Sequence, residues 1–274
     1  MNAIWLNGAV VDADAATISP VDHGLMVGDG VFETMAVVRG AAFAVRRHLE
    51  RLRRSAGALG LAVPSDAELR AAVEAVVAAN GDAVGRVRIT VTGGPGPLGS
   101  GRGGGAPTVL VIAGPPPEWP ASASVVVVPW PRNERGAVAG VKTISYAENV
   151  VALAWAQARG AGEALFLNTA GVLCEGTGTN VFVGVGGGLV TPPLSAGCLA
   201  GVTRDLLLEL GAGEEADVSP EQLAAADELF LSSSTRDVQP IHEIDGRSVP
   251  GCPGPLTENA AAAFAALVAR DLDP

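Results

Sequence analysis

The order of apolar and polar residues predicts a first domain of strands and helices over residues 1–114. Near its start, Asn7-Gly8 interrupts a short apolar run, which predicts a hairpin. Leu49, Leu52 and Ala56 follow one another at the three- and four-residue spacing of a helix face. The rest of the pattern predicts a helix from the capping box at 65–68 to residue 80, extended segments at 31–38, 86–92 and 108–113, and a flexible glycine-rich loop at 93–105.

A proline-rich stretch then interrupts the pattern. Residues 114–120 contain four prolines, which neither a helix nor a central strand accommodates. We therefore expect a linker at 115–121 and a larger domain at 122–274, which together with the first domain gives an α/β (α+β) fold class. In the larger domain, strands are predicted at 122–128, 164–167, 180–185, 189–191 and 229–232, and helices at 148–159, from 202, from 219 and at 257–270.

Composition narrows the class of protein and of partner. Hydrophobic residues make up 48% of the 274 residues and mean hydropathy is +0.34, which suffices for a buried core. The formal charge of −11 argues against a nucleic-acid partner, because phosphate contacts need clustered cations. We expect no signal peptide, no membrane association and a cytoplasmic location, because no basic and then apolar leader is present and the apolar runs are short. The three cysteines and three histidines are widely spaced, which predicts no metal site.

Lysine usage singles out one position. Lys142 is the only lysine, beside seventeen arginines, so any mechanism that needs a lysine amine must use it. Its neighbours Val141 and Ile144 are apolar, and the segment precedes a predicted helix. A partly desolvated amine has a lowered pKa and becomes the nucleophile that Schiff-base chemistry needs. A solvated surface lysine is the commoner fate, and it stands as the alternative.

Three further segments carry candidate chemistry, and each has an ordinary structural explanation. Glu175, followed by a loop of glycine and threonine, is either a solvated turn residue or a carboxylate directed at a ligand. Residues 201–204 form a glycine turn that opens a helix, where free N–H groups either bind an anion or are simply capped. The hydroxyl run 232–235 follows a predicted strand and is equally ambiguous.

Taken together, these motifs resemble the class IV aminotransferases and lyases, which are fold-type IV enzymes that use pyridoxal phosphate (PLP). The family includes branched-chain and D-amino-acid aminotransferases and 4-amino-4-deoxychorismate lyase. The resemblance spans nearly the whole chain, and it keeps the order of six blocks and the spacing from Lys142 to Glu175. The matching blocks are 23–34, 48–56, Lys142, 175–182, 201–204 and 228–240.

The resemblance implies a cofactor and a role for each matching residue. Lys142 would be the Schiff-base lysine, and Glu175 would keep the pyridine nitrogen protonated so that the ring acts as an electron sink. Arg51 would grip the phosphate with its guanidinium fork. The other implied cofactor-binding residues are Asn180, Val202, Thr203 and Ser234, with Ser233 or Thr235 as a further neighbour of the phosphate. The implied fold joins a small N-terminal α/β domain to a larger, PLP-binding pseudo-barrel domain, and the family's paired subunits imply a homodimer.

Departures from the family pattern favour one member of it. D-amino-acid enzymes carry an Arg-x-His pair in the loop after the strand at 86–92, whereas this loop has Arg102 as its only cation. Branched-chain enzymes have a tyrosine five residues after the lysine, whereas here Tyr146 comes four residues after it. Thr34 resembles the lyase, in which a hydroxyl at this place is associated with proton transfer during elimination. The bland alternative is that Thr34 is an ordinary β-branched strand residue.

We therefore expect a lyase that splits 4-amino-4-deoxychorismate into pyruvate and 4-aminobenzoate on the folate route. Its catalytic residues would be Lys142, Glu175 and Thr34, and Tyr146 and Arg102 would contact the small-molecule amino substrate. The alternative is an aminotransferase of the branched-chain or D-amino-acid type that acts with a 2-oxo acid. A more remote alternative is a relative that binds PLP without turnover. A few residues of the substrate pocket separate the lyase from the aminotransferase.

Overall fold

The computed structural model describes residues 2–274, which form two compact units. The first unit holds the chain up to Pro117, the short segment Val141–Tyr146 and the last four residues, Asp271–Pro274. The second unit holds Glu118–Gly140 and Ala147–Arg270. Each unit has its own sheet and its own hydrophobic core.

Two segments belong to a different unit from the one that the sequence suggested. The segment Val141–Tyr146 and the C-terminal residues were both expected in a continuous domain over 122–274, but they are part of the first unit. The backbone explains this, because Phe32 N donates a hydrogen bond to Lys142 O at 3.0 Å and Ala44 N donates one to Leu272 O at 2.7 Å. Such pairings join residues far apart in sequence, and a local pattern does not reveal them.

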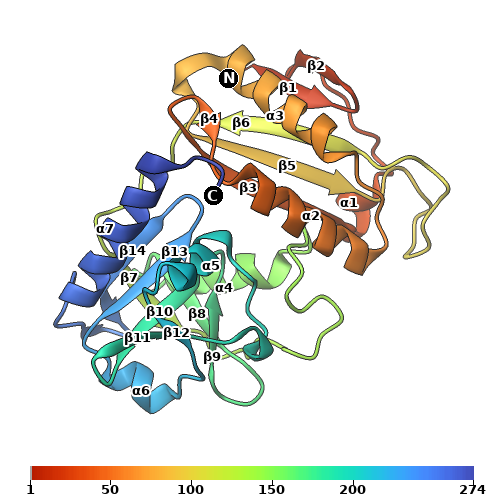
Figure 1. Ribbon diagram of the computed structural model, residues 1–274. Coiled ribbons are helices and arrows are strands. Elements are labelled where there is room, and N and C mark those ends of the chain that lie inside the picture. The colour runs from red at the N-terminus through yellow and green to blue at the C-terminus, as the bar shows by residue number, and fades with distance from the viewer. Residues whose placement is uncertain (1) are drawn as a thin grey trace. The chain divides into compact units, whose positions relative to one another are not determined.

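The first unit is built on a six-stranded sheet in the order β2-β1-β6-β5-β3-β4, with every neighbouring pair antiparallel (Figure 1). Thr34 of β3 lies opposite Arg88 of β5 in this sheet. The elements of the unit are β1 (Ala3–Leu6), β2 (Ala9–Asp12), α1 (His23–Val27), β3 (Gly30–Val38), β4 (Ala41–Ala42), α2 (Val45–Leu59), α3 (Asp66–Asn80), a 3-10 turn (Gly81–Ala83), β5 (Arg86–Thr92) and β6 (Val109–Gly114).

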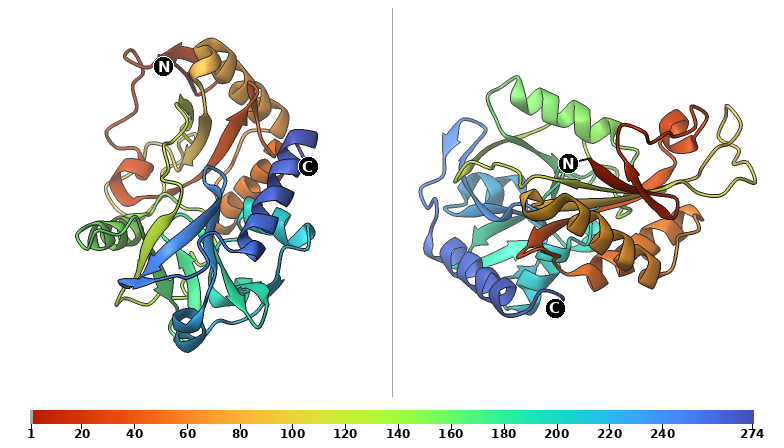
Figure 2. Two further views of the ribbon diagram at one scale, coloured as in Figure 1. Left: turned by 90° about the vertical axis from the view of Figure 1, so that its left-hand side faces the viewer. Right: turned by 90° about the horizontal axis from the view of Figure 1, so that it is seen from above.

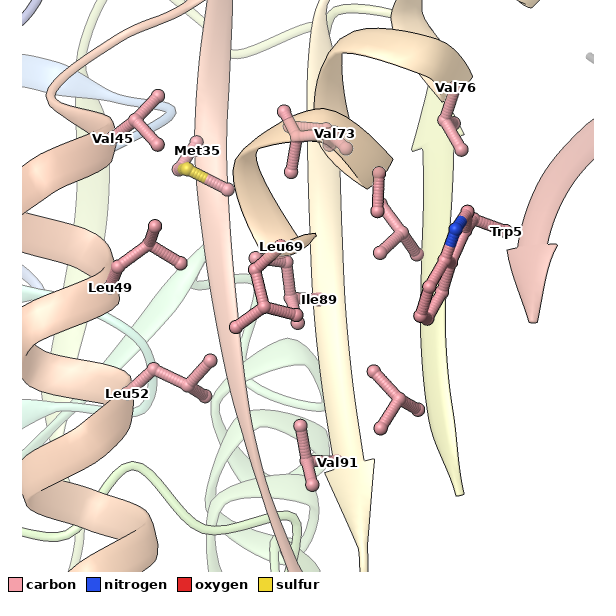
Figure 3. Close-up of a cluster of buried hydrophobic side chains, with 14 of the residues drawn as sticks. Trp5, Met35, Val45, Leu49, Leu52, Leu69, Val73, Val76, Ile89 and Val91 are labelled. Atoms are coloured by element: carbon pink, nitrogen blue, oxygen red, sulfur yellow. The ribbon is translucent and has the colours of Figure 1, made fainter. Parts of the chain in front are cut away.

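Helices α2 and α3 cover one face of this sheet and bury the core of the unit. Leu49 and Leu52 of α2 point toward β3, and Leu69 of α3 lies over the sheet (Figure 3). From the strands, Met35 and Ile89 contribute to the same core and are fully buried. Because side chains alternate along a strand, the neighbours of these core residues point to the opposite face of the sheet.

The opposite face carries polar and aromatic side chains. On β3 it presents Phe32 and Thr34, and on β5 it presents Arg88 and Thr90. Phe32 is buried, while the other three are half-buried. Helices α2 and α3 lie on the other face, while α1 approaches this face at Thr92, whose side chain meets Gly24.

The second unit has a nine-stranded mixed sheet in the order β12-β11-β10-β13-β14-β7-β8-β9, with β15 paired to β14 (Figure 1). Strand β9 also contacts β10, so the sheet curls toward itself. The elements are β7 (Ala123–Val127), α4 (Ala147–Gln157), β8 (Glu163–Leu167), β9 (Leu173–Gly176), β10 (Asn180–Val185), β11 (Gly188–Thr191), a 3-10 turn (Leu194–Ala196), α5 (Val202–Glu209), β12 (Glu214–Glu215), α6 (Pro220–Ala225), β13 (Leu229–Ser233), β14 (Asp237–Ile244), β15 (Arg247–Ser248) and α7 (Pro255–Arg270).

Two hydrophobic clusters hold the second unit together. The larger one lies within the curled sheet and is closed by α6, with Val181, Leu231 and Leu223 among its members. The other packs α4 against β8, through residues such as Ala152 and Phe166. Helix α7 runs beside β14 (Figure 2). No helix within residues 2–274 is long and apolar enough to cross a bilayer, and the same residues contain no group of three or more side chains suited to a metal ion.

Candidate functional site

The backbone of Lys142 is fixed by its pairing with β3. The segment around it runs antiparallel to the start of that strand, with Val31 opposite Thr143. Ile144 N donates a hydrogen bond to Gly30 O at 2.9 Å, which extends the pairing by a residue. From the other side, Lys142 N donates to Ser55 Oγ of α2 at 3.1 Å. The only lysine of the chain is therefore held at a defined position rather than in a mobile loop.

The side chain of Lys142 is half-buried and lies against an aromatic ring. Its Nζ is 4.4 Å from the centre of the Phe32 ring. A cation over a ring face is stabilised by the negative potential of that face. The amine of Lys142 therefore lies against the face of β3 that carries Phe32, which favours the functional interpretation over a fully solvated lysine.

Three other candidate or polar residues gather near the same ring. The edge of Tyr146 meets Phe32 with the ring centres 5.3 Å apart and the planes at 76°. The guanidinium carbon of Arg88 lies 3.7 Å from the centre of the Phe32 ring. Thr34 lies two residues beyond Phe32 on the same face of β3, where it is paired with Arg88. Thr34 is half-buried on the side of β3 away from the core of the first unit.

A buried ionic cluster lies on the core side of the same strand. Glu33 is fully buried and accepts hydrogen bonds from Arg51 Nε at 2.8 Å and Nη2 at 2.7 Å. Its Oε2 is also 2.6 Å from His48 Nδ1. Burial alone would raise the pKa of Glu33, but Arg51 and His48 outweigh it and bring the pKa down to about 2. Glu33 is thus ionised, and it holds the guanidinium of Arg51 in one orientation.

Arg102 is already engaged by a carboxylate. Its Nε and Nη2 donate to the two oxygens of Asp29 at 2.7 and 2.6 Å, and its Nη1 donates to Gly60 O at 3.2 Å. The Arg102 guanidinium lowers the pKa of Asp29. The cation that the sequence suggested for the substrate therefore has a fixed partner within its own unit.

In the second unit, Glu175 of β9 accepts one backbone hydrogen bond and lies near one guanidinium. Its Oε2 accepts a hydrogen bond from Leu199 N at 2.9 Å, and its Oε1 is 3.6 Å from Arg132 Nε. Arg132 itself is stacked 4.0 Å from the centre of the Phe166 ring and also pairs with Glu148. The N–H group and the guanidinium both favour the ionised form of a carboxyl group. The geometry therefore suits a carboxylate that faces a protonated nitrogen.

The thiols near Glu175 are not available as nucleophiles. Cys174 and Cys198 are both buried and unpaired. Burial raises the pKa of Cys174 well above its usual range, and burial followed by the Glu175 charge raises the pKa of Cys198 to about 12. Because only the thiolate attacks an electrophile, these residues stay inert at neutral pH. The lysine amine is the stronger candidate for covalent chemistry.

The start of α5 offers an anion site. Gly201 is its N-cap and supplies no side chain to the backbone N–H groups of the first turn, which includes Val202 and Thr203. A Cβ at Gly201 would overlap Asn180 Oδ1, so any other residue there would displace the Asn180 side chain. Asn180 lies opposite Ser232 across β10 and β13, and Ser232 Oγ is buried without a hydrogen-bond partner. Uncapped N–H groups beside an unsatisfied hydroxyl fit a phosphate.

The two serines that the sequence suggested lie beside this place. Ser233 ends β13 and Ser234 follows it, and both are half-buried. Ser233 Oγ accepts a hydrogen bond from Arg236 N at 3.2 Å. Ser232, which the sequence grouped with them but did not single out, is the one with a buried and unsatisfied hydroxyl.

The candidate residues fall into both units. The first unit brings Lys142, Thr34 and Tyr146 together around Phe32, with Arg51 on the core side. The second unit holds Glu175, and near α5 it holds Asn180, Val202, Thr203, Ser233 and Ser234.

Sequence reasoning missed Glu33, Arg88 and Arg132. Strand alternation was a usable signal for Arg88, because Val87 and Ile89 mark the core face and leave Arg88 on the other. The residues next to Arg132 in the sequence do not indicate a role for it. Its side chain lies near Glu175, which is forty-three residues further along the chain.

Comparison with known proteins gives a consistent result. The sequence model of the family described as "Amino-transferase class IV" matches residues 30–244. A Methanocaldococcus jannaschii protein assigned as a branched-chain-amino-acid aminotransferase is 35% identical, over 90% of this chain and 89% of that protein. The bifunctional aminodeoxychorismate lyase/D-amino acid transaminase of Mycobacterium tuberculosis is 32% identical, over 91% of this chain and 93% of its own length.

A solved structure is similar over almost the whole chain. It is the PLP-bound form of a hypothetical aminotransferase from Mycobacterium tuberculosis, with a TM-score of 0.87 and 28% identity. The match covers 98% of this chain and 99% of that one. The fold class predicted from the sequence, with its fold-type IV architecture, is confirmed.

Proposed function

This chain belongs to the class IV aminotransferase family and uses pyridoxal phosphate as the enzymes of that family do, and on that premise we propose that it transfers the amino group of an α-amino acid to a 2-oxo acid. The sequence favoured the lyase and kept the aminotransferase as the alternative. The relatives support the alternative better, because the 35% identical protein is assigned as a branched-chain aminotransferase. The lyase name occurs in a relative that is also a D-amino acid transaminase. A relative without turnover is not supported, since these proteins are enzymes.

The observation that carries the proposal is the placement of the only lysine. Lys142 has its backbone bonded to β3 and α2, and its amine lies over the ring of Phe32. A half-buried amine on an otherwise open sheet face is suited to covalent catalysis with a carbonyl group. When bound, PLP supplies an electron sink for the α-carbon of the substrate. Lys142 would hold the cofactor at rest, and its amine would move a proton to and from that α-carbon during transfer.

Glu175 would hold a proton on the pyridine nitrogen. A carboxylate can do so only if it stays ionised, and the hydrogen bond from Leu199 N together with the nearby Arg132 favours that state. Arg132 does not complete a hydrogen bond with Glu175 at 3.6 Å.

We propose that the phosphate is held by the residues that the family resemblance implies. In the second unit, the first turn of α5 at Val202 and Thr203 supplies N–H groups, and Asn180, Ser233 and Ser234 lie nearby. In the first unit, Arg51 supplies a guanidinium that Glu33 orients. Arginine suits this task because its planar fork matches phosphate oxygens.

The lyase is the second candidate, and Thr34 is the observation that favours it. Its hydroxyl is on the same sheet face as Phe32, against which the Lys142 amine lies. A hydroxyl so placed could relay a proton to a leaving group. The similarity to a bifunctional lyase and transaminase supports keeping this activity beside amino transfer.

We also propose that the enzyme acts as a cytoplasmic homodimer. Helix α1 exposes three consecutive apolar residues, of which Leu25 has 71% of its surface accessible. Helix α4 exposes Val150 at 62% and Val151 at 54%. Contiguous exposed apolar side chains commonly mark an interface with another protein. Light scattering of the purified protein at several concentrations tests this, and a monomer throughout would refute it.

The proposed function is tested by supplying the purified, PLP-loaded protein with pairs of amino acids and 2-oxo acids of both stereochemical series. In parallel, it is given aminodeoxychorismate and assayed for pyruvate. We expect amino transfer with branched-chain or D-amino acids. Pyruvate release without any amino transfer would assign the protein to the lyase branch. Lys142→Ala is the control for both assays, because background activity must vanish when the amine is removed.

A further inference from the structure

Glu163, the first residue of β8, is a buried carboxylate to which the proposed function gives no role. Only 1% of its surface is exposed. Its Oε1 accepts a hydrogen bond from Thr177 N at 3.1 Å and another from the Thr177 hydroxyl. Its Oε2 accepts one from Thr179 Oγ1 at 3.4 Å and one from Arg236 Nη2 at 3.3 Å. Glu163 therefore holds the loop 177–179 and at the same time pairs with a guanidinium.

Arg236, the partner of Glu163, lies in the turn 234–236 between β13 and β14. Its side chain is 8% exposed, and burial lowers its pKa, as expected for a cation removed from water. Its main chain is also fixed, because Arg236 N donates to Ser233 O and to Ser233 Oγ, each at 3.2 Å. Arg236 thus joins the buried carboxylate to the turn that begins at Ser234.

A tryptophan and an amide hold the guanidinium of Arg236 in place. Its Cζ lies 3.7 Å from the centre of the Trp119 ring, and its Nη1 donates to Gln239 Oε1 at 2.6 Å. Trp119 Nε1 in turn donates to Thr235 O at 2.8 Å, and Gln239 Nε2 donates to Pro120 O at 2.8 Å. The end of the stretch that was expected as a linker is therefore bound to the same turn.

The register of the second sheet brings this turn and the loop 177–179 to the same end of two strands. Asn180 of β10 lies opposite Ser232 of β13 in an antiparallel pair. The loop 177–179 leads into Asn180, and the turn 234–236 follows shortly after Ser232. In an antiparallel pair, the start of one strand lies beside the end of the other. The ion pair connects the two segments at that end.

We infer that the ion pair of Glu163 and Arg236 positions the groups that bind the cofactor phosphate, a role that rests on the proposed placement of that phosphate near Asn180, Ser233 and Ser234. Several polar groups from separate loops must converge on one anion. A buried contact that fixes both loops beforehand removes the entropic cost of ordering them when the anion binds. The two residues act through the loops, so they are positioning residues and not ligands of the phosphate.

A comparison of PLP with pyridoxal, which lacks the phosphate, tests this inference. Dissociation constants are measured by absorption titration of the whole protein freed of its cofactor. The proteins are the parent, Glu163→Gln, Arg236→Gln, the double variant and Arg159→Gln. Arg159 is the matched control, because its guanidinium lies 3.5 Å from the centre of a tryptophan ring, that of Trp155, but is exposed. Phosphorus NMR of each PLP-loaded protein reports the surroundings of the phosphate, and circular dichroism confirms that each variant is folded.

We expect each single variant to raise the dissociation constant of PLP by roughly tenfold and to leave that of pyridoxal within about twofold of the parent value. The phosphorus signal should shift in both variants. Because the two residues act through one contact, the double variant should bind PLP about as well as the weaker single variant. Arg159→Gln should bind both compounds like the parent.

Three results would overturn the inference. The first is parent-like affinity for PLP in both single variants. The second is an equal loss of affinity for PLP and pyridoxal, which is what a general loosening of the second unit would produce. The third is a pair of losses that multiply in the double variant, because residues that act independently are not a positioning pair.

Gly201→Ala separates a failure of the inference from a failure of the proposed phosphate placement. This change displaces Asn180 at the start of α5 and leaves the ion pair intact. If Gly201→Ala loses affinity for PLP while the ion-pair variants do not, the inference fails and the placement stands. If Gly201→Ala and the ion-pair variants all bind PLP like the parent, the placement fails and the inference fails with it. The amino-transfer assay of the parent tests the proposed reaction separately from these titrations.

Discussion

Replacement of Glu33 by glutamine should lower the free energy of unfolding far more than replacement of a carboxylate on the surface does. Glu33 is fully buried and is bonded to Arg51 and His48. A pKa lowered from 4.5 to about 2 corresponds to about 3 kcal/mol of stability at neutral pH, at 1.36 kcal/mol per unit. Removing one partner of a buried ion pair typically costs about 3–5 kcal/mol, because the other charge is left uncompensated. The two figures describe the same interaction and are not added.

The dependence on pH follows from the direction of the pKa shift. Because the folded-state pKa of Glu33 is depressed, its contribution is fully present above pH 4.5 and is lost as pH falls toward 2. Urea unfolding of the parent and of Glu33→Gln is monitored by circular dichroism at a series of pH values from 7 downward. The measurement gives the difference between their free energies of unfolding at each pH. The gap in unfolding free energy should be constant to about pH 4.5 and should narrow below it.

Glu50→Gln is the matched control for this experiment. Glu50 is on α2, the helix that carries Arg51 and His48, and it pairs with Arg46. Both side chains of this pair are about half exposed. Exposed pairs of this kind contribute at most about 1 kcal/mol. If Glu33→Gln costs no more than Glu50→Gln, or if the gap does not respond to acid, then the buried pair does not stabilise the first unit as argued.

The remaining predictions concern the cofactor and the choice of reaction. Borohydride reduction of the yellow, PLP-loaded protein should attach the cofactor to the peptide containing Lys142, and a protein that takes up no PLP would contradict the assignment. Glu175→Gln should keep PLP binding but lose turnover by about 10²-fold or more, as is typical when a preorganised charge is removed, and unchanged turnover would mean that Glu175 does not serve the ring nitrogen. If the lyase activity is present, Thr34→Ala and Thr34→Val should both depress pyruvate release by roughly 10²-fold or more, and a fully active Thr34→Val would show that the hydroxyl is not used. Gly201→Ala should raise the dissociation constant of PLP by about tenfold or more, since the α5 terminus would be disturbed, while Gly188→Ala, which meets no neighbouring atom, should not.

Helices with a periodic apolar face were predictable from the sequence. The spacing of Leu49 and Leu52 marks α2, and the helix ends before Gly60, which has a positive φ of 65°. The expected capping box opens α3, where Ser65 Oγ accepts a hydrogen bond from Glu68 N at 3.3 Å. In both cases the information is local, because the residues that define the helix are within a few positions of one another.

Two elements were not predictable in this way. Helix α1 has only five residues, too few to show a period, and Asp22 caps it by accepting a hydrogen bond from Gly24 N at 2.8 Å. Strand β14 contains Pro240, which a sequence pattern excludes from a strand interior. The strand tolerates it beside a register shift between Ile241 and Glu243 in its pairing with β7.

The candidate site was predictable as far as single residues and motifs go. Lys142 follows from the absence of any other lysine, and Glu175 follows from the family resemblance. Whether an arginine is paired with a carboxylate depends on residues that are close in the fold but distant in the sequence. Arg102 and Arg88 look alike in the sequence, but only the former has an aspartate within hydrogen-bonding distance. The difference is electrostatic, because Arg102 is paired with Asp29, a residue seventy-three positions earlier in the chain.

The chain passes into the first unit three separate times, and this constrains how the protein is made. Synthesis proceeds from the N-terminus, and domains that are continuous in sequence can fold as they emerge from the ribosome. Here the segment that pairs with the start of β3 on the side away from β5 emerges only with Lys142, and the hydrogen bond from Ala44 N to Leu272 O forms only after residue 272 has been made. The first unit therefore reaches its final form only after residues 271–274 have been made. The contacts that position Lys142, by contrast, involve only residues 30–144 and are available before the second unit has been made.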